Sequence, residues 1–251
     1  MEFYSEFSKN YDKIFPLNSQ KLELIDNTFK DLNKKREKTK LLDVGCGTGS
    51  YALELAKKGY QIQAIDLEAE MISIAESKMK KARVEVDFYR LGMLNLKEKF
   101  NSASFDGIYI IGNVLVHLTK KEIKEFLELA AELLKENGKI FIQIVNYYRI
   151  LELNLEGLPT IYSQDDSVRF ERDYEYDTQK NIMHFKTRLI DHFDDQILSK
   201  NDIELYPLCK SELEDYLNKA GFKVDAVYGS PQGDQYRELN SIPLILSAQK
   251  N

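Results

Sequence analysis

A short apolar strand passes into a glycine turn and then a helix in the stretch Leu41-Leu42-Asp43-Val44-Gly45-Cys46-Gly47-Thr48-Gly49-Ser50. Glycines at alternate positions let the backbone turn sharply and let a ligand approach the main chain, while the helix N terminus offers unpaired N–H groups. The dinucleotide-binding fingerprint has its third glycine one position later, where this chain has Ser50, and Asp43 is unusual for it. A tight turn without a ligand is the alternative, but the pattern favours a ligand site.

The same order of helix, glycine stop and strand recurs along the chain. Glycine just past a helix adopts the left-handed conformation that closes it, and strands alternating with helices indicate a parallel sheet covered on both faces. The repeats are Tyr51–Lys58, Gly59 and Gln61–Ile65; Glu122–Lys135, Asn137-Gly138 and Ile140–Ile144; and Ser211–Lys219, Gly221 and Phe222–Val227. The remaining pattern predicts a helix over Lys21–Lys35 and strands over Lys40–Val44, Val84–Leu91, Phe105–Ile111 and Ser241–Ala248.

This rhythm breaks over residues 147–206. Val168–Tyr176 and Met183–Phe193 carry the aromatic and β-branched residues typical of strands, and Asp177–Asn181 forms a turn between them. We therefore predict an antiparallel β insertion over 147–206 that acts as a lid and substrate subdomain, on a core of residues 1–146 and 207–251. A dimer interface is the alternative role, since exposed antiparallel edges invite pairing.

Composition and charge limit the class of protein. The 251 residues are 43% hydrophobic, enough for one full core, and 41 acids against 35 bases give a net charge of −6. Nucleic-acid binding needs clustered Lys and Arg, so we expect no nucleic-acid partner. Cys46 and Cys209 lie far apart, in no metal or redox spacing. With no signal peptide and no apolar run of membrane-spanning length, we expect a cytoplasmic protein without a metal or a membrane contact.

The stretch Asp43–Gly49 resembles the first motif of the class I S-adenosylmethionine (SAM)-dependent methyltransferases, and the resemblance spans most of the chain. It implies SAM as cofactor, with the backbone around Gly45 and Gly47 against its methionine and ribose part. It also implies an α/β, Rossmann-like, mostly parallel sheet of seven strands in the order 3-2-1-4-5-7-6, the last antiparallel. The final helix–strand pair is followed by one more strand without a crossover helix, which agrees with that topology.

An acid ends the second predicted strand, at Ile65-Asp66-Leu67. A carboxylate there can accept hydrogen bonds from two vicinal ribose hydroxyls, and the resemblance gives Asp66 this role and places Leu67 against adenine. A helix N-cap is the alternative for Asp66, because a helix over Glu68–Lys78 follows. Met71 either lines the adenine pocket or packs in the core, the commoner role of a methionine at helical spacing.

The family usually carries an acid near the adenine amino group, after the third strand. Gly92 stands in its place in this chain, so recognition there must rest on backbone groups and Met93. An N-terminal Tyr-Asp segment serves related enzymes as a flap over SAM, and Tyr11-Asp12 fits that role. Plain packing of an amphipathic segment is the alternative.

The block from Ile111 to Leu118, with Asn146-Tyr147 after the fifth strand, is similar to the glycine and sarcosine N-methyltransferase branch. In that branch the Gly-Asn backbone, here Gly112-Asn113, lines the methionine end of SAM, and the histidine one turn on, here His117, lies near the site. Taken alone, a histidine such as His117 is more often structural, and the resemblance makes a role at the cofactor site about equally expected. The branch carries an arginine immediately before Asn-Tyr for the substrate carboxylate; this chain has Val145, with Arg149 as a substitute, so glycine is not carried over as substrate.

Two sets of candidate residues follow. The cofactor set is Tyr11, Asp43, Gly45, Cys46, Gly47, Asp66, Leu67, Met71, Gly92, Met93, Ile111, Gly112, Asn113 and His117. The substrate set, chosen because aromatic walls with a few polar groups suit a small organic acceptor, is Tyr147, Arg149, Tyr176, His184 and Tyr206. His117 is the candidate for a catalytic proton acceptor, a nearby tyrosine is the alternative, and the reaction does not require a dedicated base.

The predicted function is transfer of the SAM methyl group, by in-line displacement, to a small molecule such as an amine. SAM is already activated, which agrees with the lack of a Ser–His–Asp set, a zinc spacing or a Walker lysine. A catalytically silent SAM-binding protein and an NAD-dependent oxidoreductase are the alternatives. The acceptor atom and the oligomeric state, monomer or dimer, stay open.

Overall fold

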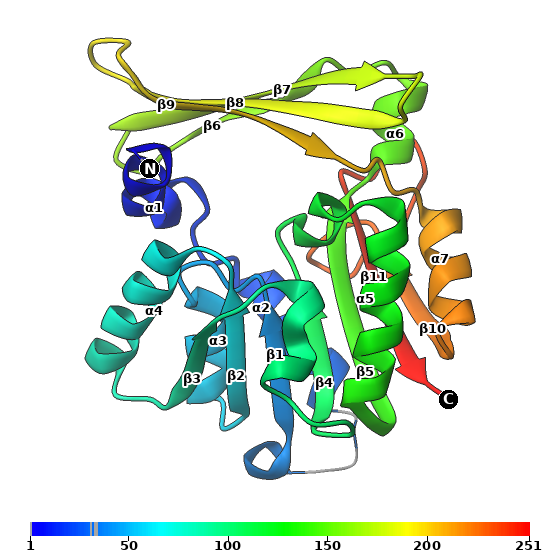
Figure 1. Cartoon of the computed structure of the whole chain (residues 1–251). Coiled ribbons are helices and arrows are strands. Elements are labelled where there is room, and N and C mark those ends of the chain that lie inside the picture. The colour runs from blue at the N-terminus through cyan, green and yellow to red at the C-terminus, as the bar shows by residue number, and fades with distance from the viewer. Residues whose placement is uncertain (1, 31, 33–34) are drawn as a thin grey trace.

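A seven-stranded sheet forms the centre of the molecule (Figure 1). The computed structural model describes residues 2–30, 32 and 35–251. The strands lie in the order β10-β11-β5-β4-β1-β2-β3, and β11 runs antiparallel to both of its neighbours. With β10 and β11 counted as the sixth and seventh core strands, this order is 3-2-1-4-5-7-6, so the predicted fold is confirmed. Their bounds are β1 Lys40–Val44, β2 Gln61–Asp66, β3 Val86–Arg90, β4 Phe105–Ile110, β5 Leu134–Val145, β10 Phe222–Tyr228 and β11 Pro243–Lys250.

Helices cover both faces of this sheet because its central strands are apolar on both sides. Leu41 and Leu42, neighbours on β1, are both fully buried and belong to two separate hydrophobic clusters. Helices α2 and α3 pack in the Leu41 cluster, and α5 and α7 in the Leu42 cluster. The helix bounds are α2 Ser19–Lys30, α3 Ser50–Lys57, α4 Ala69–Ala82, α5 Lys120–Leu133 and α7 Lys210–Lys219, with short 3₁₀ helices η1 Arg36–Lys38, η2 Met93–Glu98 and η3 Val114–His117. Among the described residues, no helix has the length and apolar character needed to cross a membrane.

A second, four-stranded antiparallel sheet lies across the top of the molecule in Figure 1, and we call it the roof. Helix α1, Glu2–Ile14, lies beneath one end of the roof, and α6, Tyr147–Glu152, beneath the other. The predicted pairing is present, with Tyr176 opposite Met183 across the turn. The sequence pattern does not predict β6, because Gly157 and Pro159 weaken the strand signal of an edge strand. The roof strands are β6 Gly157–Tyr162, β7 Val168–Asp177, β8 Ile182–Asp191 and β9 Ile197–Leu205.

The roof is joined to the rest of the molecule by two hydrophobic contacts. At the α6 end, Tyr174, Met183 and Leu205 belong to the Leu42 cluster of the core. At the α1 end, Phe170 and its neighbours form a smaller cluster with Ile14. Each side chain that bridges the two layers removes apolar surface from water on both, so the roof is held at both ends.

Two predicted helix ends differ from the structure. Helix α2 ends at Lys30 rather than Lys35, and positions 31, 33 and 34 of the predicted helix lie outside the described residues. Helix α5 ends at Leu133 because β5 already begins at Leu134. The left-handed residue there is Asn137, at φ 60°, and not Gly138. A Cβ on Gly138 would lie 2.9 Å from the carbonyl oxygen of Lys135, so close backbone approach requires this glycine.

Candidate active site

The glycine turn after β1 is anchored to the end of β2. The backbone N–H groups of Gly45 and Cys46 both donate to the Ile65 carbonyl, at 2.9 Å. A Cβ on Gly45 would lie 2.6 Å from Val114, and one on Gly49 would lie 2.8 Å from Phe88, so packing alone requires both glycines. Gly47 differs from them.

Gly47, at φ 54°, is covered by a side chain from outside the turn. The three atoms nearest to a Cβ placed there all belong to the ring of Tyr11, at 3.4–3.5 Å. Tyr11 comes from α1, far away in the sequence, and its ring covers this part of the turn. Burial raises the pKa of Tyr11, and the nearby negative charge of Asp66 raises it further. The ring therefore lies near Gly47 and near Asp66, the two predicted contacts of SAM.

Asp66 is held by the backbone on both of its oxygens. Oδ2 accepts a hydrogen bond from Gly47 N at 2.8 Å, and Oδ1 accepts one from Glu68 N at 3.0 Å. Burial raises the pKa of Asp66, although these backbone donors act against it. The N-cap of α4 is Glu68, not Asp66. Each carboxylate oxygen can accept a further hydrogen bond, so the site retains capacity for two ligand hydroxyls.

A polar cluster fastens α1 to the same turn. Asp12, next to Tyr11, accepts a hydrogen bond from Thr48 Oγ1 at 2.5 Å and pairs with Lys78 Nζ of α4 at 2.7 Å. Lys78 also donates to Ser50 Oγ at 2.6 Å, so the three elements share one network. The same helix packs on the roof through the Ile14 cluster and through the Lys13–Asp165 ion pair at 2.9 Å. Helix α1 therefore links the glycine turn to the roof.

A lysine that the sequence patterns do not single out lies near the end of β4. Lys21 Nζ donates to Gln143 Oε1 at 3.1 Å, and Gly112 N donates to the same oxygen at 3.0 Å. Burial lowers the pKa of Lys21 to about 8, and none of the described carboxylates pairs with it. In the sequence, this place could have been recognised from Gln143, because a polar residue there interrupts the apolar run Ile140–Ile144.

Asp43 underlies this region instead of lining it. Its side chain is buried beside Tyr109, and no hydrogen bond of good geometry among described groups reaches its Oδ1. Burial raises the pKa of Asp43 to about 8, while the Tyr109 hydroxyl acts in the opposite direction. Ile111 is also buried, within the Leu41 cluster, and Cys46 donates its backbone N–H to β2.

The loop after β4 fixes a tyrosine of α6. Asn113, at φ 69°, accepts from Val145 N and donates through Nδ2 to Tyr147 Oη, both at 2.9 Å. Both the oxygen and the nitrogen of its side-chain amide are therefore bonded within the protein. His117, at the end of η3, is open to solvent, yet the surrounding protein lowers its pKa, against the opposing charge of Asp66. The imidazole is therefore neutral at pH 7.

Two of the residues predicted at the adenine end of SAM, Leu67 and Gly92, also lie close together. Leu67 is 63% exposed, and its Cδ1 lies 3.9 Å from the position of a Cβ on Gly92. Gly92 is the N-cap of η2, whose first residue is Met93. Met71, on α4, is buried.

Comparison with known proteins agrees with this geometry. Residues 41–138 match the family model described as a methyltransferase domain. The chain is 28% identical over 229 residues to a methyltransferase homologue of Geobacillus sp. (strain WCH70), covering 88% and 89% of the two chains. It is 24% identical over 245 residues to the glycine/sarcosine N-methyltransferase of Aphanothece halophytica, covering 94% and 86%. A SAM-dependent methyltransferase from Clostridium acetobutylicum ATCC 824 has the same fold, with a TM-score of 0.81, 18% identity and 99% of each chain covered.

The chain is a class I SAM-dependent methyltransferase. Its cofactor is SAM, and the NAD-dependent oxidoreductase alternative is excluded. The methyltransferase brings Tyr11, Gly47 and Asp66 together, and Asp12 of the predicted Tyr-Asp segment is bonded to the same turn. Lys21, bonded to Gln143, is a further candidate that the sequence patterns did not single out.

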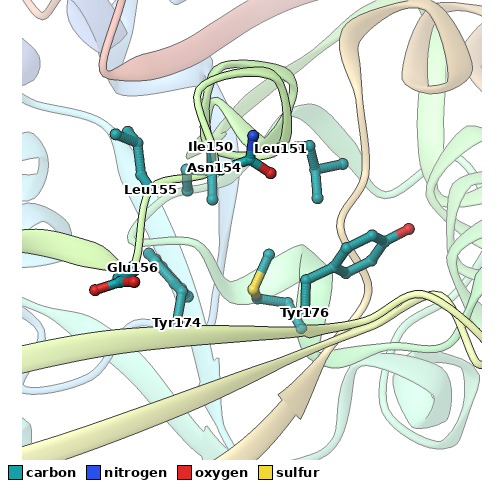
Figure 2. A pocket seen from close by; sticks show the side chains of 8 residues that line it. Ile150, Leu151, Asn154, Leu155, Glu156, Tyr174 and Tyr176 are labelled. Atoms are coloured by element: carbon teal, nitrogen blue, oxygen red, sulfur yellow. The ribbon is translucent and has the colours of Figure 1, made fainter.

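The predicted substrate residues of the methyltransferase do not all meet. Tyr147 is fully buried and its ring meets that of Tyr174 edge-on, with ring centres 6.3 Å apart. Tyr176 lines a pocket under the roof (Figure 2). Tyr206 and Arg149 are engaged elsewhere: Tyr206 Oη donates to Glu212 at 2.8 Å, and Arg149 Nε donates to the Leu239 carbonyl at 3.1 Å.

His184 is placed on the wrong side of the roof for an acceptor contact. Its strand neighbours Met183 and Phe185 pack toward the core, so His184 points to the opposite, outer face. There it lies 3.4 Å from Asp202. His184 therefore faces away from the space beneath the roof, and its prediction as an acceptor contact is wrong.

Proposed function

We propose that this methyltransferase acts on a small-molecule amine that binds between the core sheet and the roof. The observation that carries the proposal is the roof itself, which lies over the strand ends and shares a hydrophobic cluster with them through Tyr174 and Met183 (Figure 1). Ligands of open α/β sheets bind at the carboxyl ends of the strands, and a cover held at both ends favours a small acceptor over a polymer.

An amine acceptor is supported by the neutral imidazole of His117 and by two similar proteins. One is the glycine/sarcosine N-methyltransferase of Aphanothece halophytica. The other is SAM-bound CalS10, an amino pentose methyltransferase from Micromonospora echinaspora, with a TM-score of 0.70, 15% identity and 98% and 96% of the chains covered. An amine nitrogen must lose a proton in the course of methylation, and a neutral imidazole at the site can accept it.

Several features of the chain fit SAM. A Cβ on Gly112 would meet no heavy atom within 4 Å, so a ligand can approach the main chain there, and at Gly47 the nearest covering group is the Tyr11 ring, the proposed flap. The Lys21 ammonium, which lacks an acidic partner among the described residues, would hold the carboxylate of SAM. The Asp66 carboxylate would hold the ribose hydroxyls.

In the proposed mechanism the protein aligns the acceptor and excludes water. When bound, SAM supplies an electrophilic methyl group, so catalysis needs position more than a strong base. Asp12 holds α1 and the Tyr11 ring over the glycine turn. Asn113 fixes Tyr147 beneath the roof, and His117 takes the proton that the acceptor nitrogen releases.

Affinity for SAM is expected to fall as the pH rises above about 8, the pKa of Lys21 in the unliganded protein. A bound carboxylate favours the charged ammonium and raises this pKa, so the complex requires a proton that the free protein loses. Two pH units above that pKa, about 1% of the free protein still carries the charge, and affinity falls roughly a hundredfold. Calorimetric titration with S-adenosylhomocysteine from pH 7 to 10 measures this dependence.

The Lys21→Met variant is expected to bind S-adenosylhomocysteine ten- to a hundredfold more weakly at pH 7, in line with a charge-assisted hydrogen bond of about 1.5–3 kcal/mol. Its affinity should be flat between pH 7 and 10. Lys30→Met, an exposed lysine of the same helix, is the matched control and should behave as wild type. An unchanged pH profile in Lys21→Met contradicts the assignment.

The proposed function is tested by turnover. With SAM and a library of low-molecular-weight amines, alcohols and thiols, we expect S-adenosylhomocysteine to form with one or more amines. We expect none above background with casein, bulk tRNA or the alcohols and thiols. Turnover confined to alcohols or thiols contradicts the amine, and turnover confined to protein or RNA contradicts the small acceptor.

A further inference from the structure

The inner face of the roof is apolar at both ends and polar in the middle. On β7, Phe170 belongs to the hydrophobic cluster at the α1 end and Tyr174 to the cluster at the α6 end. Arg172 lies between them and faces the same side, because alternate residues of a strand share a face. Thr187 of β8 lies opposite Arg172, and Asn201 of β9 lies opposite Thr187. A row of polar side chains therefore crosses the middle of the inner face.

Arg172 is the charged member of this row, and it has no acidic partner among the described residues. The side chain is half-buried. Its one described hydrogen bond runs from Nη2 to the Pro159 carbonyl, and its Nε is buried without an acceptor. Burial lowers the pKa of Arg172. Because a cation removed from water is costly unless an anion or several acceptors surround it, Arg172 lacks the group that would neutralise it.

The arginines on the outer face of the same two strands are paired. Arg169 lies 3.1 Å from Glu171, and Arg188 lies 3.0 Å from both Glu171 and Asp173. The sheet thus gives acidic partners to its outward arginines and none of the described ones to Arg172. An inward cation without a counter-ion, in a sheet whose outward cations are paired, points to an anion that is not part of the protein.

On its α1 side, Arg172 adjoins the helix that covers the glycine turn. Phe170, the next inward residue of β7, packs against Phe15 with ring centres 5.6 Å apart. Phe15 packs in turn against Tyr11, at 5.2 Å, and the Tyr11 ring covers Gly47. This side of the polar row therefore lies over the turn proposed to contact SAM.

On its α6 side, Arg172 adjoins the loop after β4. Burial raises the pKa of Tyr174 to about 12 and the charge of Arg172 acts against that rise, so the guanidinium lies near the Tyr174 hydroxyl. The Tyr174 ring lies 6.3 Å from that of Tyr147, whose hydroxyl accepts a hydrogen bond from Asn113. Arg172 thus lies beneath the roof, between the two segments proposed to hold the methionine part of SAM (Figure 1).

We propose that Arg172 binds an acidic group of the acceptor, a carboxylate or a phosphate, so that the acceptor is an amine that also carries a negative charge. This rests on the proposed function. The planar guanidinium matches both acidic groups in shape, and Thr187 and Asn201 add neutral polar side chains to the same row. Lys21, which also lacks an acidic partner among the described residues, is assigned to the carboxylate of SAM, which leaves Arg172 for the acceptor.

The test compares amines that differ only in their acidic group, by calorimetric titration of the full chain saturated with S-adenosylhomocysteine. The panel pairs each proteinogenic amino acid, β-alanine and γ-aminobutyrate with its carboxamide, and O-phosphoethanolamine with ethanolamine. In at least one pair, wild type should bind the acidic member about tenfold or more tightly, as expected for a charge-assisted hydrogen bond. A preference within the carboxamide pairs identifies a carboxylate, and one confined to the last pair identifies a phosphate.

Arg172→Gln removes the charge but keeps an N–H donor for the Pro159 carbonyl, and it should abolish this preference. Binding of the acidic member should weaken about tenfold or more, and binding of its neutral partner should not change. Arg172→Lys keeps the charge and should retain part of the preference. Arg188→Gln, an arginine of the outer face, is the matched control and should behave as wild type. Unchanged affinity for S-adenosylhomocysteine shows that each variant is folded.

Three results overturn the proposal. In the first, wild type binds no acidic member of the panel more tightly than its neutral partner. In the second, Arg172→Gln keeps the preference. In the third, Arg172→Gln and Arg188→Gln lose it equally, which would indicate an effect of overall charge.

Failure of this proposal is distinguishable from failure of the proposed function. If amines are methylated without preference for acidic ones, and Arg172→Gln turns them over as wild type does, the role of Arg172 fails and the methylation of amines stands. If no amine is methylated while Arg172→Gln selectively loses the acidic probes, Arg172 binds an acidic group and the proposed reaction fails. Where both proposals hold, kcat/KM for an acidic acceptor should be about tenfold or more lower in Arg172→Gln than in Arg188→Gln.

Discussion

Gly47→Val is expected to abolish SAM binding, with a loss greater than a hundredfold, while the sheet stays folded. The backbone at Gly47 has φ 54°, and the space beyond its Cα is bounded by the Tyr11 ring. A branched side chain would occupy the place where the proposed ligand meets the main chain and would push Tyr11 away from the turn. Calorimetric titration with SAM measures the loss, and circular dichroism checks the fold.

The matched control is Gly221→Val, at the end of α7. Gly221 has φ 86°, and a Cβ there would meet no heavy atom within 4 Å. Both substitutions place a β-branched residue in the left-handed region, which costs on the order of 1–3 kcal/mol of stability. Only the one at the glycine turn should affect SAM. If Gly47→Val and Gly221→Val bind SAM equally well, the turn is merely structural.

The core sheet could be predicted from the sequence because its determinants are local. The repeated order of helix, glycine and strand reports on consecutive residues, and the apolar character of Leu41 and Leu42 already indicates burial on both faces. The contact between Gly47 and Asp66 could also be predicted, since Gly47 lies in the turn after β1 and Asp66 ends β2, the neighbouring strand of one βαβ unit.

The rest of the site depends on contacts that no spacing encodes. The Asp12–Lys78 pair joins α1 to α4, and Lys21 reaches Gln143 across the molecule. Such pairs arise from how helices lie on the sheet, and a lysine on an amphipathic helix has no local mark of burial. Tyr147 was predicted as an acceptor wall, but its hydroxyl is already bonded to Asn113.

The placement of His184 was within reach of the sequence. Side chains alternate between the two faces of a strand, and Met183, Phe185 and Leu189 mark the inner face by their apolar character. His184 has the opposite parity. The register shift between Leu189 and Ile190 affects only the far end of β8, so parity holds at this position.

Asp66→Ala is expected to weaken SAM binding about ten- to a hundredfold, the effect of removing a charged acceptor of hydrogen bonds. The variant also removes the acceptor of Gly47 N, so the turn loses an anchor as well as the ribose contact. Asp87→Asn, an exposed aspartate on the neighbouring strand β3, is the control and should bind as wild type. Unchanged SAM affinity in a folded Asp66→Ala protein contradicts the ribose assignment.

The pH dependence separates a ligand contact from a loss of turn structure. Burial raises the pKa of Asp66 in the free protein, and ribose hydroxyls that donate to the carboxylate favour its charged form and lower that pKa. SAM affinity should therefore fall as the pH is lowered through the raised pKa of Asp66, while Lys21 makes it fall above about 8. The wild-type profile should be bell-shaped. Asp66→Ala should lose its acidic limb and keep the alkaline one, whereas a purely structural role for Asp66 would lower affinity equally at every pH.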